Sequence, residues 1–170
     1  MKSVVIREEQ SDDADQIRIV NERAFGQPAE AAVVDAFRGL DGAISLVAVA
    51  DDRIVGHILF TAVSVEGEAP QGSGMGLAPM AVLPDYQRSG IGSQLVKAGL
   101  DACRSRGHSF VVVVGHPAYY PRFGFVQASH MGLEYAHPVP SEAFMAIELR
   151  RDALHRRSGR VHFHPEFDRV

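Results

Sequence analysis

The chain has 170 residues, of which 46% are hydrophobic and 22% charged, ordinary values for one globular domain with a buried core. Its 17 basic and 21 acidic residues give a net charge of −4, so it lacks the basic field with which proteins collect nucleic acid. No apolar run approaches the roughly 20 residues that cross a membrane, and the charges soon after Met1 do not suit a signal peptide. Cys103 is the only cysteine, so no internal disulfide is possible and we expect a cytoplasmic protein.

The first part of the chain predicts a strand followed by two helices. Val4 to Arg7 is a short strand, and Ser11 to Asp13 supplies the side-chain oxygens that begin a helix ending near Gly26. Pro28 suits the first turn of the second helix, where its missing N–H needs no partner. The apolar spacing of this second helix predicts a buried stripe of Ala32, Val33, Ala36, Phe37 and Leu40.

A hairpin and a loop are predicted next. Ile44 to Ala50 and Arg53 to Val65 form two strands across the turn Asp51-Asp52, and the glycine-rich segment from Glu66 to Gly76 is a flexible loop. Pro79 then interrupts an apolar run. Because proline cannot donate to a sheet ladder, it predicts a β-bulge that leaves backbone groups of this strand unpaired.

The stretch from Met75 to Arg106 carries the most informative pattern. Its apolar run stops at Pro84, a polar turn follows, and after Gly92 apolar residues recur at helical spacing. This order predicts strand, tight turn and helix, with Gly90 and Gly92 at the first helical turn. The N–H groups at a helix start have no partner inside the helix, so glycines there let an anion approach closely. The glycines by themselves fit a phosphate cradle and plain turn chemistry equally well.

Two phosphate motifs are excluded by the residues around these glycines. Leu95 takes the place of the third glycine of the dinucleotide fingerprint, and the Gly-Lys-Ser/Thr of a Walker loop is missing. The stretch instead resembles the Gln/Arg-x-x-Gly-x-Gly/Ala signature of the GNAT N-acetyltransferase superfamily, after the family's usual Val-x-Pro. The matching residues are Val82-Leu83-Pro84 and Gln87-Arg88-Ser89-Gly90-Ile91-Gly92.

This resemblance implies how the chain binds acetyl-CoA. The diphosphate would lie on backbone N–H groups between Arg88 and Ser93, and Arg88 would reach a phosphate as well. The full set of loop residues implied in binding is Gln87, Arg88, Ser89, Gly90, Ile91, Gly92 and Ser93. The bulged strand would pair with the pantetheine arm through the backbone of Met80, Ala81 and Val82.

A second match follows the next strand. Ser109 to Val114 is a continuous β-branched and aromatic run, so the order from Met75 onward predicts a parallel strand pair with a right-handed crossover. Tyr120 to Phe125 then resembles the family's Tyr-x-x-x-Gly-Phe. The resemblance implies that Tyr120 protonates the departing thiolate of coenzyme A. Tyr119 is its alternative, because a shift of one residue in a short helix exchanges the two.

Two positions depart from the family's pattern. Val113 stands where many relatives have an asparagine that bonds pantetheine, and Met75 to Leu83 contains no acid where several relatives have a glutamate base. An amine must lose its proton before it attacks a thioester. His116, His57 or a chain of waters are the candidates, and the general base is unassigned.

The C-terminal part predicts a strand from Ala143 to Leu149 and a tail. His162 and His164 would share one face of a strand, a spacing that some metal sites use, but no third ligand is evident and no metal is expected. Three features resemble the YhbS-type subgroup of these acetyltransferases. They are the Gly124-Phe125 pair, the late strand and the His-Pro-x-Phe tail from His164 to Phe167. The resemblance implies a GNAT domain over residues 1–150, with a tail, 151–170, packed on the same domain.

The implied fold is α/β, a GNAT-like three-layer arrangement with a mixed (α+β) central sheet whose parallel pair splays around the bulged strand. The implied function is N-acetyl transfer from acetyl-CoA to a primary amine by direct attack, without a metal. The sequence does not identify the acceptor, which is an amine on a small molecule or a protein. It also leaves the oligomeric state open, a homodimer included. No nucleic-acid or membrane partner is expected. The missing glutamate and asparagine motivate an alternative, a non-catalytic regulator that binds CoA or acyl-CoA. A third is an adenine-nucleotide module that reads only phosphates.

Overall fold

The computed structural model of the protein describes residues 3–68, 74–155 and 157–169. The chain groups into two compact units, and neither is a continuous stretch of sequence. The first unit comprises residues 1–60, 79–99 and 166–170, and the second comprises residues 61–78 and 100–165. Among the described residues, no helix has the length and apolar character needed to cross a membrane.

The first unit is built on the antiparallel strands β1 (Val5–Glu8), β2 (Ile44–Ala50) and β3 (Arg53–Ala62), with β2 paired to both others. Asp51 and Asp52 turn the β2–β3 hairpin with φ angles of 51° and 61°. Two successive left-handed residues are what a tight hairpin turn requires, and aspartate tolerates this conformation. The predicted first strand and hairpin are confirmed. The predicted second strand is too long, because β3 ends at Ala62 and a separate strand, β4 (Ser64–Val65), follows.

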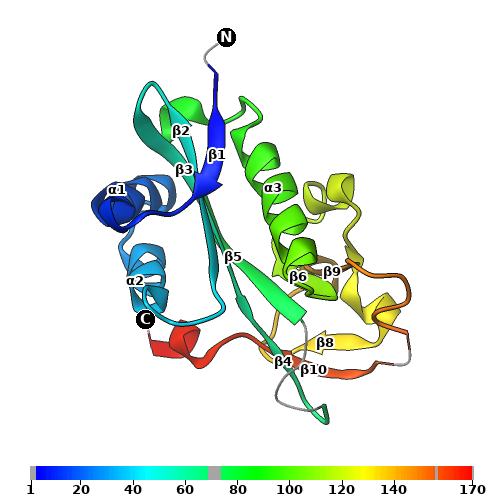
Figure 1. The fold of residues 1–170 in the computed structure, drawn as a ribbon. Helices are drawn as coiled ribbons and strands as arrows, with labels where there is room; N and C mark the ends of the chain where they lie inside the picture. Colours follow the sequence, from blue (N-terminus) through cyan, green and yellow to red (C-terminus); the bar gives the residue numbers. More distant parts are fainter. Residues whose placement is uncertain (1–2, 69–73, 156, 170) are drawn as a thin grey trace. The chain divides into compact units, whose positions relative to one another are not determined.

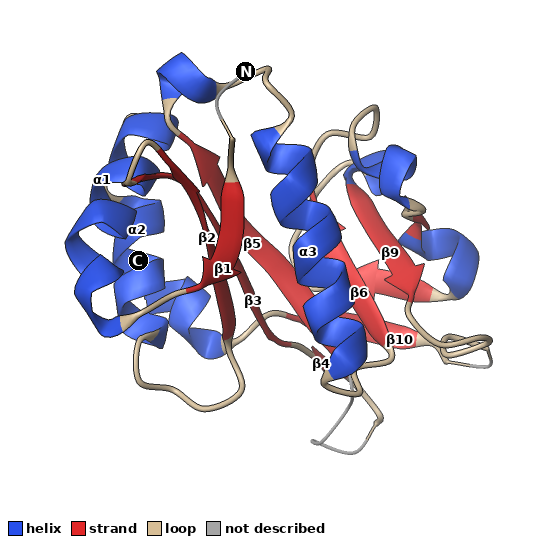
Figure 2. Ribbon diagram, turned by 45° about the horizontal axis from the view of Figure 1, so that its top comes forward, coloured by secondary structure: helices blue, strands red, loops and turns tan. Residues whose placement is uncertain are grey.

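Two helices follow β1 and lie side by side against this sheet (Figures 1 and 2). A short 3-10 turn, η1 (Ser11–Asp13), leads into α1 (Ala14–Phe25), and α2 spans Ala29–Phe37. Helix α1 ends as predicted at Gly26, whose φ is 68°. The stripe predicted for α2 is wrong at Ala32 and Leu40, which are exposed, because the helix ends at Phe37 and its buried face is rotated. The buried residues of α2 are Ala31, Val33, Val34 and Phe37.

Strand β3 directs alternate side chains to opposite faces of the sheet. A Cβ atom added at Gly56 would lie 3.1 Å from Leu95 and 3.2 Å from Ile91, both in α3 (Ile91–Ser105). His57, the next residue along, contacts Asn21 of α1 instead. Since successive strand residues point to opposite faces, α1 and the first turns of α3 cover the two sides of β3. The predicted three-layer arrangement is confirmed in this unit.

The close approach of α3 to β3 gives a stability prediction. A Cβ atom at Gly99 would lie 2.2 Å from the ring of Phe60, which is fully buried. We expect Gly99→Ala to lower the free energy of unfolding by about 2 kcal/mol, since overpacking outweighs the better helix propensity of alanine. Urea unfolding measures the change. The double variant Gly99→Ala/Phe60→Leu should recover part of the loss, and a fully stable Gly99→Ala protein would contradict the packing.

The second unit contains a mixed sheet. Strand β5 (Gly74–Val82) runs parallel to β6 (Phe110–Val114), from the pair Gly74–Phe110 to the pair Leu77–Val113. Strand β9 (Phe144–Glu148) pairs antiparallel with β6 and with the two-residue β7 (Val126–Gln127). The predicted parallel pair and the late strand are confirmed. The bulge near Pro79 and the splay stay predictions, and a register shift is found instead in β2, between Ala48 and Val49.

The predicted loop from Glu66 to Gly76 is wrong at its C-terminal end, where Gly74 and Gly76 belong to β5. Aromatic rings occupy the space that side chains would need there: a Cβ atom at Gly74 would lie 2.1 Å from the ring of Phe110, and one at Gly76 would lie 2.7 Å from that of Phe163. These glycines therefore allow close packing inside the sheet. Pro70 and Gly72 of the predicted loop lie outside the described residues.

The tail contributes a strand to a second, three-stranded sheet. Strand β10 (Gly159–His162) pairs antiparallel with β4 and parallel with β8 (Leu133–Tyr135). Because β10 ends at His162, His164 does not share its face, and that prediction is wrong. His162 Nε2 lies 2.8 Å from Glu66 Oε1. Within the described ranges, no group of His, Cys, Asp and Glu residues is arranged to hold a metal ion.

Candidate active site

The predicted diphosphate loop lies in the first unit, between the 3-10 turn η2 (Pro84–Tyr86) and α3. Two of its side chains bind the backbone just before the loop. Gln87 Nε2 donates a hydrogen bond to the carbonyl of Val82 at 2.9 Å, and Ser89 Oγ donates one to the carbonyl of Tyr86. These two contacts tie the loop to the end of β5 and to η2 and so hold it in shape.

The loop backbone has the shape of an anion site. Arg88 has a φ of 62° and Gly90 a φ of 88°, and left-handed residues in such turns direct N–H groups into a common concavity. Because α3 begins at Ile91, the N–H groups of Ile91 and Gly92 have no acceptor within the helix. A Cβ atom at Gly90 would have nothing within 4 Å. The arrangement fits a phosphate group approaching the helix start.

The strand segment implied in pantetheine binding leads directly into this loop. Ala81 is buried, and Met80 and Val82 are half-buried. The N–H of the following residue, Leu83, donates to the carbonyl of Val55 in β3 at 2.8 Å. This hydrogen bond ties the end of β5 to the hairpin and fixes where the loop begins.

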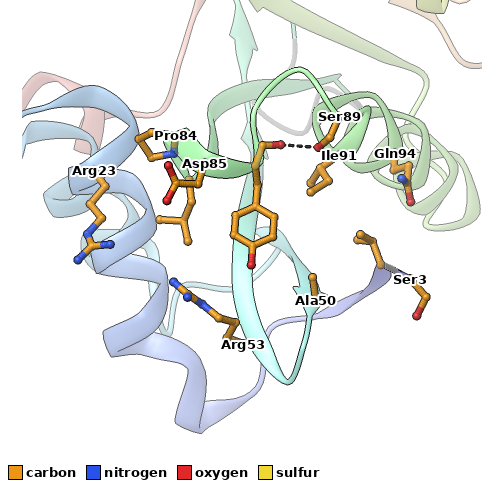
Figure 3. A pocket seen from close by; sticks show the side chains of 12 residues that line it. Ser3, Arg23, Ala50, Arg53, Pro84, Asp85, Ser89, Ile91 and Gln94 are labelled. Atoms are coloured by element: carbon orange, nitrogen blue, oxygen red, sulfur yellow. Dashed lines mark hydrogen bonds between the residues drawn. The ribbon is translucent and has the colours of Figure 1, made fainter. Parts of the chain in front are cut away.

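A cavity of about 1140 Å³ opens beside the loop within the first unit (Figure 3). Its walls come from the residues just before β1, the end of α1, the β2–β3 hairpin, η2 and the start of α3. Sequence reasoning did not identify this cavity, because its residues are scattered along the chain and share no motif. They are Ser3, Val4, Arg23, Ala50, Arg53, Leu83, Pro84, Asp85, Tyr86, Ser89, Ile91 and Gln94.

The predicted acid, Tyr120, lies in the second unit at the start of the 3-10 turn η3 (Tyr120–Phe123). Its side chain is buried and packs edge-on against Tyr119 and Phe125, with ring centroids 5.1 and 5.6 Å away. Burial, together with the neighbouring Tyr119, raises the pKa of Tyr120 to about 12. The phenol therefore keeps its proton throughout the physiological range and cannot act as a proton acceptor in its ionised form there.

One residue that the sequence did not single out shapes the surroundings of Tyr120. A Cβ atom at Gly115 would lie 2.5 Å from Cε2 of the Tyr120 ring. The ring thus occupies the space that any other side chain at residue 115 would fill. By contrast, Tyr119 is half-buried, and its ring lies 4.5 Å from the guanidinium carbon of Arg122.

His57 is unsuited to the role of general base. It is fully buried, its Nδ1 lies 3.3 Å from Nδ2 of Asn21, and its Nε2 lies 2.8 Å from Oγ of Ser45. Ser45 Oγ donates its own proton to Oε1 of Glu9 at 2.7 Å, so the tautomer that satisfies this network has the proton on Nε2 and accepts from Asn21 at Nδ1. No lone pair is left for a substrate. His116, the other histidine considered, is exposed.

The buried imidazole makes a prediction about pH. Burial, with a smaller effect of Arg38, lowers the pKa of His57 from 6.5 to about 3. Below pH 6.5 the imidazole of residue 57 binds a proton in the unfolded chain but stays neutral in the folded chain. The free energy of unfolding is therefore highest above pH 6.5 and declines toward pH 3. Relative to His57→Gln, we expect the wild-type free energy of unfolding to drop by about 2 kcal/mol between pH 7.5 and 5.0. If urea unfolding shows the same pH dependence of the free energy of unfolding for the wild type and for His57→Gln, the lowered pKa of His57 is contradicted.

Comparison with known proteins identifies the family. The model of the acetyltransferase (GNAT) domain matches residues 5–128, and the chain belongs to this family. The uncharacterized N-acetyltransferase YhbS of Escherichia coli (strain K12) is 39% identical over 169 residues, which cover 98% of this chain and 99% of YhbS.

Two solved structures are similar over almost the whole chain. The crystal structure of YhbS from Escherichia coli in complex with CoA has a TM-score of 0.91 and 37% identity, and covers 99% of this chain and 93% of its own. A GNAT family acetyltransferase from Brucella melitensis in complex with acetyl-CoA has a TM-score of 0.80 and 33% identity, with 98% and 99% covered. The GNAT-like α/β fold and the resemblance drawn from the Gln87–Gly92 signature are confirmed.

Proposed function

We propose that this protein is an N-acetyltransferase that moves an acetyl group from acetyl-CoA to a primary amine by direct attack. Membership of the GNAT acetyltransferase family supports the reaction, and the similar structures in complex with CoA and acetyl-CoA support the donor. The observation that carries the proposal is the loop before α3, whose left-handed Arg88 and Gly90 precede a helix start. This backbone suits the diphosphate of a CoA thioester.

Each part of acetyl-CoA has proposed partners. The loop residues from Gln87 to Ser93 hold the diphosphate through Gly90, Ile91 and Gly92, and Arg88 adds a charge-assisted contact to a phosphate. The backbone of Met80, Ala81 and Val82 pairs with pantetheine and polarises the thioester carbonyl, a contribution of a few kcal/mol when donors are well placed.

In the reaction, the amine nitrogen forms a bond to the acetyl carbon and the carbon–sulfur bond breaks. The amine loses one proton. Tyr120, which is protonated at neutral pH because its pKa is raised to about 12, gives its proton to the thiolate and recovers one from solvent. With His57 enclosed in its own network, His116 or solvent water takes the proton of the amine.

Other features of the protein complete the proposal. The catalytic domain spans residues 1–150, and the tail, 151–170, packs on it, as the pairing of β10 with β4 and β8 supports. The acceptor is an amine on a small molecule or a protein, and the reaction takes place in the cytoplasm. A regulator without catalysis is not favoured, because the similar proteins are named as N-acetyltransferases.

Release of free thiol from acetyl-CoA over a panel of amines tests the function. We expect amine-dependent thiol release from the wild-type protein, with one acetylated amine formed per thiol. A regulator would gain thermal stability with CoA and release no thiol with any amine. Competition by ATP as strong as that by CoA would instead indicate a site that reads only phosphates.

A further inference from the structure

Two aromatic rings pack edge-on against the proposed acid, Tyr120, and they differ in exposure. The centroid of the Phe125 ring lies 5.6 Å from that of Tyr120, and Phe125 is buried. The ring of Tyr119 lies closer, at 5.1 Å with an interplanar angle of 86°, but Tyr119 is only half-buried. Tyr119 therefore borders solvent, and a ring in that position changes rotamer readily unless a further contact holds it.

Arg122 supplies such a contact. Its guanidinium carbon lies 4.5 Å from the centre of the Tyr119 ring, and its Nε donates a hydrogen bond to the carbonyl of Tyr119 at 3.0 Å. One side chain thus contacts both the ring and the backbone of the same residue. None of the ion pairs among the described residues involves Arg122. Arginine is suited to this role, because its planar group stacks on an aromatic face while its N–H groups donate.

The orientation of Tyr120 matters because a general acid must come within hydrogen-bond distance of the atom that it protonates. A displacement of about 1 Å can reduce the rate about 10²-fold. The Tyr120 ring is confined on another side by Gly115, where an added Cβ atom would lie 2.5 Å away. Since Gly115 contributes backbone and Phe125 is buried, Tyr119 is the packing partner most free to move. Its hold on the acid therefore depends on Arg122.

We propose that Tyr119 and Arg122 are positioning residues for the proposed acid, with the guanidinium of Arg122 holding the Tyr119 ring and that ring holding the phenol of Tyr120 toward the thiolate. The inference rests on the proposed function, because it takes Tyr120 as the proton donor. It assigns to Tyr119 a role that requires its ring and not its hydroxyl. It assigns to Arg122 a role that requires both the guanidinium plane and Nε, so that positive charge alone does not suffice.

Turnover of acetyl-CoA and an amine measures these roles. Tyr119→Ala should lower kcat about tenfold, whereas Tyr119→Phe, which keeps the ring, should retain kcat. Arg122→Gln should lower kcat about two- to fivefold, the range that an exposed contact between a cation and a ring supports. Arg122→Lys should lower kcat by as much, because an ammonium group cannot make both contacts. The KM values for acetyl-CoA and for the amine should stay within about twofold of wild type in every variant.

Two further variants sharpen the kinetic test. Arg122→Gln should have no additional effect in the Tyr119→Ala background, because the ring through which the guanidinium acts is then gone. Arg104→Gln removes an exposed arginine that pairs with Asp101 on α3, and it should behave as wild type.

Ionisation of the Tyr120 phenol provides a readout that needs no turnover. The chain has four tyrosines and no tryptophan, so ultraviolet absorbance follows the phenols as the pH rises. Subtracting the titration of the same protein with Tyr120→Phe isolates the phenol of Tyr120. In the wild type, burial and Tyr119 raise the pKa of Tyr120 to about 12, so this phenol should stay protonated at about pH 10.5. In Tyr119→Ala, exposure should lower that pKa toward its ordinary value of 10.0 and ionise much of the phenol at the same pH.

Full kcat in both Tyr119→Ala and Arg122→Gln would overturn the proposal, as would an unaltered ionisation of Tyr120 in Tyr119→Ala. A raised KM with unchanged kcat in the Arg122 variants would place that arginine on a substrate instead. If Tyr120→Phe keeps full kcat, this inference fails together with the assigned acid, while N-acetyl transfer stands. A protein that releases no thiol with any amine loses the proposed function itself.

Discussion

Gly92→Leu should raise the Kd for CoA at least about 100-fold, because a leucine side chain at the start of α3 blocks the approach of the diphosphate to the backbone N–H groups. Losing two hydrogen bonds to a charged group, each worth about 1.5–3 kcal/mol, is sufficient for this effect, since every 1.4 kcal/mol is tenfold in affinity. Calorimetry measures the change. Gly92→Ala should fall between wild type and Gly92→Leu.

Gly92→Leu should fold at least as well as the wild-type protein, since leucine has a better helix propensity than glycine by up to about 1 kcal/mol. Lost affinity together with an undiminished melting temperature then locates the effect at the ligand. Ser105→Leu places the same side chain at an exposed position in the last turn of α3, and should leave CoA affinity unchanged. Unaltered affinity in Gly92→Leu is the outcome that excludes the loop as the diphosphate site.

Tyr120→Phe should lower kcat roughly 10- to 100-fold while the Kd for acetyl-CoA stays within about twofold. General-acid catalysis commonly contributes 10²–10⁴-fold, but a thiolate with an unperturbed pKa of about 8.5 leaves readily without help, so we expect an effect at or below the lower end of that range. Single-turnover thiol release separates this effect from binding. Tyr119→Phe removes the neighbouring hydroxyl and should keep full kcat. If instead Tyr119→Phe lowers kcat and Tyr120→Phe leaves it unchanged, Tyr119 is the acid.

Gly115→Ala provides an independent variant for the same group. Its methyl group would lie 2.5 Å from the ring of Tyr120, so the ring must move while the hydroxyl is retained. We expect kcat to fall about tenfold or more with little change in the KM for acetyl-CoA, as misplacement of a catalytic group by about 1 Å can reduce the rate 10²-fold. Combined with Tyr120→Phe, the alanine should add almost nothing, because the two changes disable one group.

Local signals in the sequence were sufficient for the parts of the fold that depend on neighbouring residues. The bounds of β2 and the Asp51-Asp52 turn follow from alternation and turn chemistry, and α3 follows from the spacing after Gly92. The parallel pair of β5 and β6 was predictable, because a strand, a helix and a second strand in succession usually form a parallel strand pair with a right-handed crossover. The family signature around Gly90 supplied the diphosphate loop.

Contacts between residues far apart in the sequence could not be predicted from local patterns. His57 resembled a candidate base until Asn21 and Ser45, 36 and 12 residues away, were found on its two ring nitrogens. Gly74 and Gly76 were read as loop residues, because the aromatic rings that require glycine there come from Phe110 and Phe163. A composition rule for loops fails wherever a small residue serves close packing inside a sheet.

Calorimetric titration of the wild-type protein with CoA and with pantetheine is the most direct measurement, because the two ligands share the thiol arm and differ in the diphosphate and adenosine. We expect CoA to bind once per chain and pantetheine to bind at least about 100-fold more weakly, as the loss of several charge-assisted hydrogen bonds requires. Absence of heat with millimolar CoA, or equal affinity for the two ligands, would contradict a diphosphate held by the amides around Gly90 and Gly92.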